Sequence, residues 1–146
     1  MAESGEYRGS VMSKMTDQDA DVPGWLEPLC RIPLDFRSGR LSILELFEHA
    51  KPDLADARFA SLVRERLRSD PLMITAWQDY SYDKRTDSGP YMEEGRVGFF
   101  DIFEGQGRRS DVRTHKHLAE ACVDFIYREA AWVIEDRRVT GPEGVG

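Results

Sequence analysis

The stretch that decides the fold is Leu118–Ile134, LAEACVDFIYREAAWVI. Apolar residues recur there at the 3.6-residue period of one helical face: Ala119, Cys122, Val123, Ile126, Ala130, Val133 and Ile134. Phe125 and Trp132 widen this stripe, while the charged residues occupy the other side: Glu120, Asp124, Arg128 and Glu135. Asp124 and Arg128 have the i,i+4 spacing of a weak surface ion pair. The pattern predicts a long closing helix, laid across a sheet or between other helices.

Composition indicates one folded domain. The chain has 146 residues, of which 40% are hydrophobic and 32% are charged. Its 27 acidic and 20 basic residues give a net charge of −7, which repels phosphate backbones and disfavours a nucleic-acid partner. Solubility explains this acidity most simply, and a basic protein partner is the second explanation.

The N-terminus lacks a hydrophobic signal region, and no run approaches the ~18 apolar residues of a membrane span. A cytoplasmic location is the default expectation.

The N-terminal half is expected to be helical. Residues 1–22 are polar and aperiodic, which predicts a flexible tail, and 23–39 carries prolines and glycines that predict an irregular segment anchored by Trp25. Ser42 and Glu45 fit a capping box that begins a short helix. Pro52 ends that helix and is a candidate start for the next one, which stops at 69–71. The two helices are expected to form an antiparallel hairpin with a tight connection.

The second half is expected to contain a small sheet. Residues 72–82 combine helical spacing with strand-forming residues, and a helix to about Tyr80 is favoured. A loop at 86–90 is followed by a strand at 96–103, a turn at 105–107 and an edge strand at 109–114. The fold class is therefore α+β: a helical N-terminal half, a small antiparallel sheet and a long C-terminal helix packed on it. The domain is expected to span 23–138, with a flexible tail at 139–146.

Candidate catalytic and metal-binding groups are sparse. His115 and His117 would need a third metal ligand, for which Asp101 and Asp111 are candidates, and solvated histidines before a helix are the simpler interpretation. Asp79, Asp83 and Asp87 lack the glycine and terminal glutamate of a calcium loop. Cys122 is expected to be a small buried hydrophobe, and a disulfide with Cys30 stays open. We expect no metal and no cofactor.

One stretch has the composition of a protein interface. Residues 77–85 are rich in Trp, Tyr and Arg, which dominate interface hot spots. Acidic residues within and after this stretch would meet a basic cleft of a partner. The candidate partner-binding residues are Trp77, Asp79, Tyr80, Tyr82, Asp83, Arg85, Asp87, Tyr91, Glu93 and Glu94. The alternative, of about equal weight, is a core tryptophan with tyrosines at the boundary.

Three segments carry a family resemblance. The sequences YDKR at 82–85 with GPY at 89–91, VGFFD at 97–101 and ACVDFI at 121–126 are together similar to those of small bacterial immunity proteins of polymorphic or contact-dependent toxin systems. The resemblance covers roughly residues 40–135. It implies a cytoplasmic, non-enzymatic protein that binds a cognate toxin domain and occludes its active site. The acidity of the chain adds the expectation that this domain is basic. It carries over no catalytic residue.

Two other classes of function stay open. The first is a small metal-dependent hydrolase that uses the His115/His117 region, which predicts metal retained through purification. The second is a regulatory module that dimerises through residues 77–82. The sequence alone is compatible with a monomer or a dimer.

Overall fold

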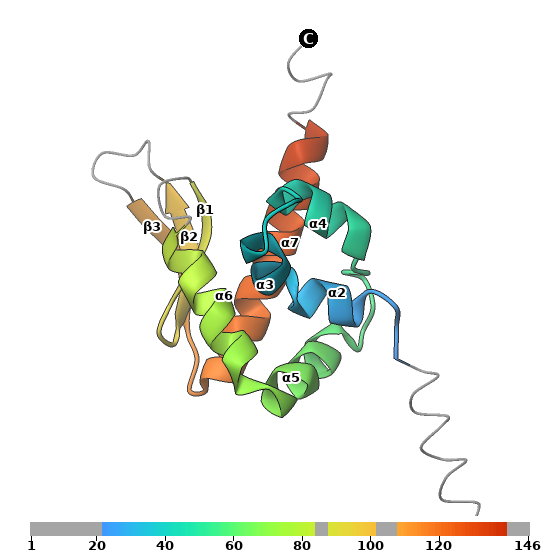
Figure 1. Cartoon of the computed structure of the whole chain (residues 1–146). Coiled ribbons are helices and arrows are strands. Elements are labelled where there is room, and N and C mark those ends of the chain that lie inside the picture. The colour runs from blue at the N-terminus through green and yellow to red at the C-terminus, as the bar shows by residue number, and fades with distance from the viewer. Residues whose placement is uncertain (1–21, 84–87, 102–107, 140–146) are drawn as a thin grey trace, which may run out of the picture.

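The computed structural model describes residues 22–83, 88–101 and 108–139 (Figure 1). The described ranges contain helices α2 (Leu26–Cys30), α3 (Ile32–Arg37), α4 (Ile43–Ala50), α5 (Phe59–Ser69), α6 (Pro71–Asp83) and α7 (Leu118–Val139), and strands β1 (Gly89–Glu93), β2 (Arg96–Asp101) and β3 (Arg108–Thr114). The predicted α+β class is confirmed. Apart from residues 22 and 139, the tails expected at 1–22 and 139–146 lie outside the described residues, as does the turn expected at 105–107. No helix within the described ranges is both long and apolar enough to cross a membrane.

Helix α7 is the central element. It runs between the sheet on one side and the N-terminal helices on the other, and it contacts β1, β2, α4, α5 and α6 (Figure 1). Its predicted apolar face is confirmed: Cys122, Phe125, Ile126 and Ala130 are fully buried. Val133 and Ile134 continue that face as partly buried side chains packed against the core.

The sheet is antiparallel with the strand order β1-β2-β3. Met92 of β1 and Val97 of β2 are paired across the strands and are both fully buried. Strands β2 and β3 lie where the sequence predicts them, within the described residues. Strand β1 was not predicted, because Gly89-Pro90 is typical of a turn. Proline is nevertheless tolerated near the start of an edge strand, since no neighbour there needs its missing N–H group.

A side chain of α6 satisfies the outer edge of β1. The buried Ser81 hydroxyl accepts a hydrogen bond from the Met92 N–H group at 2.7 Å and donates one to the Met92 carbonyl at 3.0 Å. Ser81 thus takes the place of a neighbouring strand at this position, and it fixes α6 against the sheet.

The segment at 23–39 is more regular than predicted. It forms two short helices, α2 and α3, joined at Arg31. Pro33 lies in the first turn of α3, where a proline costs little because the N–H groups of that turn have no intrahelical acceptor. The predicted role of Trp25 is confirmed: its side chain is 9% exposed and its ring stacks on Phe59, with 5.3 Å between centroids.

Helix α4 begins as predicted, and the helix after it does not. Ser42 and Glu45 form the full capping box, and α4 ends at Ala50 before Pro52. Helix α5 starts only at Phe59. The side chains of Asp53 and Asp56 accept hydrogen bonds from the N–H groups of Ala55 and Arg58, so local turns replace the start expected at Pro52.

The predicted antiparallel hairpin of α4 and α5 is wrong. Both helices pack instead against α2, which lies between them. Arg66 of α5 donates two hydrogen bonds to Glu27 of α2, at 2.5 and 2.8 Å. This bidentate interaction lowers the pKa of Glu27.

Ser81→Ala is expected to destabilise the protein by about 1–3 kcal/mol, because the buried N–H and carbonyl groups of Met92 lose their partner. Unfolding in urea, monitored by circular dichroism, measures this change in the free energy of unfolding. Ser61→Ala, which removes an exposed hydroxyl on α5, serves as the control and should change stability by less than about 0.5 kcal/mol. Equal stability of the two variants would contradict the proposed role of Ser81.

Candidate functional site

Some residues of the predicted interface stretch are buried and others are exposed. Trp77 is fully buried, Tyr80 is 8% exposed and Tyr91 is 3% exposed. The expectation that these three aromatic side chains are surface anchors is therefore corrected: they belong to the core. For Trp77 and Tyr80 the physical reason is that α6 is covered along one side by α7 and β1, where large aromatic rings bury the most apolar area.

Tyr91 packs within the sheet itself. Its ring lies across Gly98 on the neighbouring strand, so closely that a Cβ atom at position 98 would come 3.0 Å from the tyrosine Cε1 atom. The Arg109 guanidinium lies over the same ring, 5.3 Å from its centroid. The Tyr91 ring is thus buried against Gly98 and Arg109 of the other two strands.

Other predicted residues lie on the surface. Asp79, Tyr82 and Asp83 are exposed, and their spacing places them on one side of α6. Glu94 is exposed at the β1–β2 turn, and Glu93 lies 3.7–3.9 Å from the guanidinium groups of Arg96 and Arg109. Arg85 and Asp87 lie outside the described residues.

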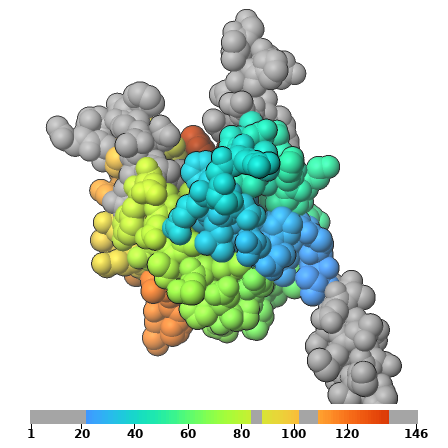
Figure 2. Space-filling view, in the orientation of Figure 1, coloured from blue at the N-terminus to red at the C-terminus, as the bar shows by residue number. Residues whose placement is uncertain are grey.

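Helices α3 and α6 together present a surface that we name the α3–α6 face. It comprises Phe36, Arg37, Leu72, Asp79, Tyr82 and Asp83. Figure 2 shows the two helices side by side on the viewed face. Phe36, Leu72 and Tyr82 are 44%, 77% and 40% exposed. Arg37 reaches Asp79 at 3.4 Å. Exposed aromatic and aliphatic groups beside charged ones are the composition of a protein-binding surface.

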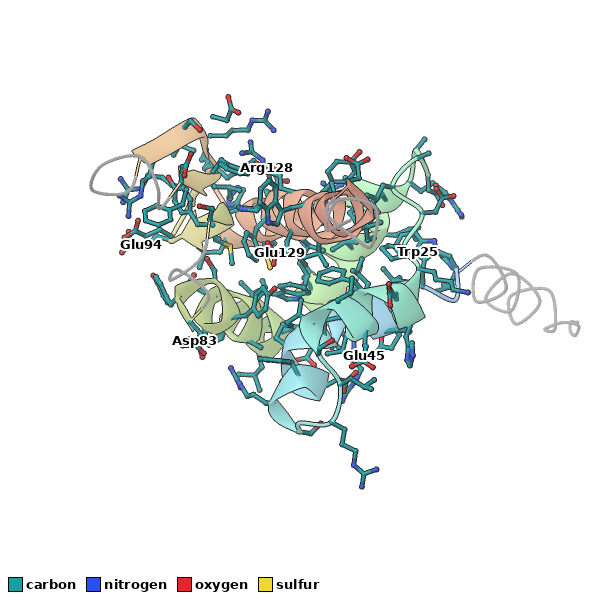
Figure 3. The ribbon with its side chains drawn as sticks, turned by 90° about the horizontal axis from the view of Figure 1, so that it is seen from above. Trp25, Glu45, Asp83, Glu94, Arg128 and Glu129 are labelled. Atoms are coloured by element: carbon teal, nitrogen blue, oxygen red, sulfur yellow. The ribbon has the colours of Figure 1, made fainter. Side chains whose placement is uncertain are left out.

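A cavity of about 650 Å³ opens beside this face, between α3, α6 and α7. Its walls include the apolar residues Pro33, Ile43, Trp132 and Val133, and its polar groups include Asp83 and Glu129. Glu129 is only 1% exposed. Figure 3 shows Glu129 on the side of α7 that faces α6, whereas Arg128 leaves α7 on the opposite side.

Glu129 interacts with the core through Tyr80. The Tyr80 hydroxyl donates a hydrogen bond to Glu129 Oε2. Burial and the nearby carboxylate raise the pKa of Tyr80 well above its usual value, so the phenol stays neutral and acts as a donor. The sequence analysis missed Glu129. Its spacing gave a signal, because Glu129 follows Cys122 by seven residues, Phe125 by four and Ile126 by three, which places a carboxylate on the apolar face of α7.

A second polar cluster surrounds Asp124 of α7. His115 Nε2 lies 2.8 Å from Asp124 Oδ2, and Arg128 Nε donates to Oδ1 at 2.9 Å. Arg113 Nη1 is 3.6 Å from Oδ2. The predicted Asp124–Arg128 pair exists, but it is more than a weak surface pair, since the Asp124 side chain is 11% exposed and binds three groups. The interactions fix the start of α7 against the end of β3.

Two hollows flank this cluster. One of about 430 Å³ includes Arg64, Arg113 and His115 in its lining, and a wider groove of about 830 Å³ lies between β3 and α7. Tyr127 lines both, with 42% of its surface exposed, and Val112 lines the wider groove.

The described residues do not form a metal-binding site. They contain no group of three His, Cys, Asp or Glu side chains placed to hold an ion. His115 is engaged by Asp124, and His117 is exposed before α7. The third ligand that the metal-dependent hydrolase would require is therefore not supplied by these residues.

Comparison with known proteins identifies no relative: no protein-family model matches the chain, and neither a curated protein nor a solved structure matches it.

Cys30 and Cys122 are expected to resist alkylation in the native protein. Both thiols are free and buried, and burial raises the pKa of Cys30 to about 12 and that of Cys122 well above its usual value. At about pH 8 neither forms a significant amount of thiolate, the nucleophilic species. Iodoacetamide should modify both residues in urea and neither in buffer. Mass spectrometry detects the modification. Rapid modification in buffer would contradict this placement.

Proposed function

We propose that this chain is an immunity protein: a cytoplasmic, non-enzymatic protein that binds a cognate basic toxin domain and occludes its active site. The observation that carries the proposal is the α3–α6 face, where three large exposed apolar side chains accompany two exposed aspartates. The net charge of −7 supports a basic partner. The segments that resemble immunity proteins include part of this face, at Tyr82 and Asp83.

Charge and apolar contact have separate roles in this proposal. Asp79 and Asp83 attract a basic surface over a distance of about one Debye length, ~8 Å at physiological ionic strength, and so raise the association rate. Phe36, Leu72 and Tyr82 lose their contact with water only in the complex, and they therefore slow dissociation. Inhibition requires only that the bound protein cover the active site of the toxin.

The α3–α6 face is also compatible with self-association, the dimeric alternative. Light scattering on the purified chain separates the two possibilities, because a dimer formed through this face would cover the surface assigned to the toxin. A monomer retains that surface for a partner.

The first functional test combines capture with growth rescue. The tagged chain is used to isolate partners from the native bacterium, and the C-terminal domain of any stoichiometric partner is expressed in a laboratory host. The proposal predicts arrested growth with that domain alone and normal growth when the chain is co-expressed. A partner whose domain is harmless, or whose toxicity persists despite binding, would contradict it.

The double variant Asp79→Lys/Asp83→Lys is expected to associate roughly tenfold more slowly with the captured partner and to lose most of the salt dependence of the association rate. Surface plasmon resonance at two salt concentrations measures both effects. The matched control is Glu48→Lys/Glu65→Lys, the same charge change at exposed positions of α4 and α5. Equal rates for the two double variants would remove the α3–α6 face from the interface.

A further inference from the structure

We infer that the open edge of β3 joins the same edge of a second copy of this chain, so that the two sheets form one continuous sheet. This inference goes beyond the proposed function and does not depend on it. Strand β3 lies at one end of the order β1-β2-β3 (Figure 1). Ser81 of α6 occupies the opposite edge, at Met92 of β1. A joint at β3 therefore leaves the α3–α6 face free for another partner.

The edge is accessible to a second chain. The side chains of residues 109–114 are all exposed, and no further strand lies beyond β3 among the described residues. The His115 N–H group donates a hydrogen bond to the Gly95 carbonyl, on the side of β2. Because the bonding direction alternates along an antiparallel strand, the N–H and carbonyl groups of Val112 are directed to the open edge. Such an edge is a template for pairing with another chain.

The sequence of β3 is complementary to itself in one antiparallel alignment. Residues 110–114 read SDVRT. A two-fold axis at Val112 places Asp111 of each copy opposite Arg113 of the other, and Val112 opposite its own copy. Opposite charges and β-branched residues directly across from each other stabilise a strand pair. The neighbouring alignments, centred on Asp111 or on Arg113, bring arginine side chains together, so charge selects the alignment centred on Val112.

The same joint covers exposed apolar surface beside α7. Asp111, Val112 and Arg113 all line the groove of about 830 Å³ between β3 and α7. A two-fold antiparallel joint places both α7 helices on the same side of the continuous sheet, so the two grooves face each other. Val112 and Tyr127, which are 48% and 42% exposed, would then lose contact with water.

The local charge allows two acidic chains to meet here. Each chain has a net charge of −7, which opposes association in general. The charged residues among the described lining of the groove are two basic ones, Arg113 and Arg128, and two acidic ones, Asp111 and Glu135. This part of the surface is therefore balanced, and each basic group can meet an acidic group of the other copy.

Contacts with α7 hold the edge in place before pairing. Asp111 has a left-handed φ of 52°, and a bulge near this point shifts the register with β2. Arg128 donates a hydrogen bond to the Asp111 carbonyl at 3.0 Å and another to the Asp124 carboxylate at 2.9 Å. Bulges and charges protect an edge from unspecific pairing. On β3 they restrict pairing to a complementary strand, and a second copy supplies one.

Sedimentation equilibrium of the full chain measures the self-association. A small edge-to-edge joint predicts a reversible dimer with a dissociation constant on the order of 10–100 µM. Val112→Lys places like charges opposite each other at the axis and should raise this constant about fivefold or more. The matched control is Leu72→Lys, at an exposed position of the α3–α6 face, which should leave the constant unchanged. Circular dichroism checks that each variant is folded.

A charge exchange tests the alignment. Arg113→Asp makes both cross-strand pairs of positions 111 and 113 acidic, and Asp111→Arg makes both of them basic. Each variant alone should dimerise at least about tenfold more weakly than the natural chain. An equimolar mixture of the two variants should recover most of the association, because every such pair again joins an aspartate to an arginine. If either charge variant does not fold, Val112→Lys decides the question.

Three outcomes would overturn the inference. The first is a natural chain that stays monomeric up to about 1 mM, well above the expected dissociation constant. The second is a dimer that Leu72→Lys weakens and Val112→Lys does not, which would place the joint on the α3–α6 face. The third is a monomer whose β3 amides become protected from hydrogen exchange only when a captured protein is added, which would assign the edge to that protein.

Discussion

Trp77 is the residue on which the arrangement of the helices depends. Its indole Nε1–H group donates a hydrogen bond to the Cys30 carbonyl at 3.0 Å, where α2 gives way to α3. Its ring also packs against Phe47 of α4, Tyr80 of α6 and Phe125 of α7. One fully buried side chain of α6 therefore contacts three other helices: α2, α4 and α7. This packing fixes the rotation of α6 about its axis, and that rotation decides which of its residues face solvent.

The rotation of α6 separates a structural side from a surface side. The structural side carries Trp77, Tyr80 and Ser81, which contact the helical core, Glu129 and the edge of β1. The surface side carries Leu72, Asp79 and Tyr82, to which α3 adds Phe36. Aromatic residues occur on both sides of α6, so composition alone does not show which side is buried. The exposure of each side chain in the structure distinguishes the two sides. The exposed side forms part of the α3–α6 face, which supports the proposed binding function.

Local signals in the sequence predicted local structure well. Three predictions that depend only on neighbours along the chain are confirmed: the apolar period of α7, the Ser42–Glu45 capping box and the strand residues of β2. Features that depend on distant contacts were missed. Strand β1 is stabilised by Ser81 from another element, and α2 and α3 are too short to show a helical period. The prediction of an α4–α5 hairpin failed because α2 lies between those helices. For the same reason the sequence could nominate Trp77, Tyr80 and Tyr91 but could not show that they are buried. The spacing of Glu129 placed it on the apolar face of α7, and the structure added its hydrogen bond with Tyr80.

The central claim is that the α3–α6 face is the surface that binds the partner. Hydrogen–deuterium exchange of the chain, alone and in complex with the captured toxin domain, tests it most directly, because amide protection marks the covered surface. The account predicts new protection in the exposed parts of α3 and α6, with little change along β3 and the outer side of α7. Protection concentrated in the groove between β3 and α7, with α3 and α6 exchanging as in the free protein, would contradict it.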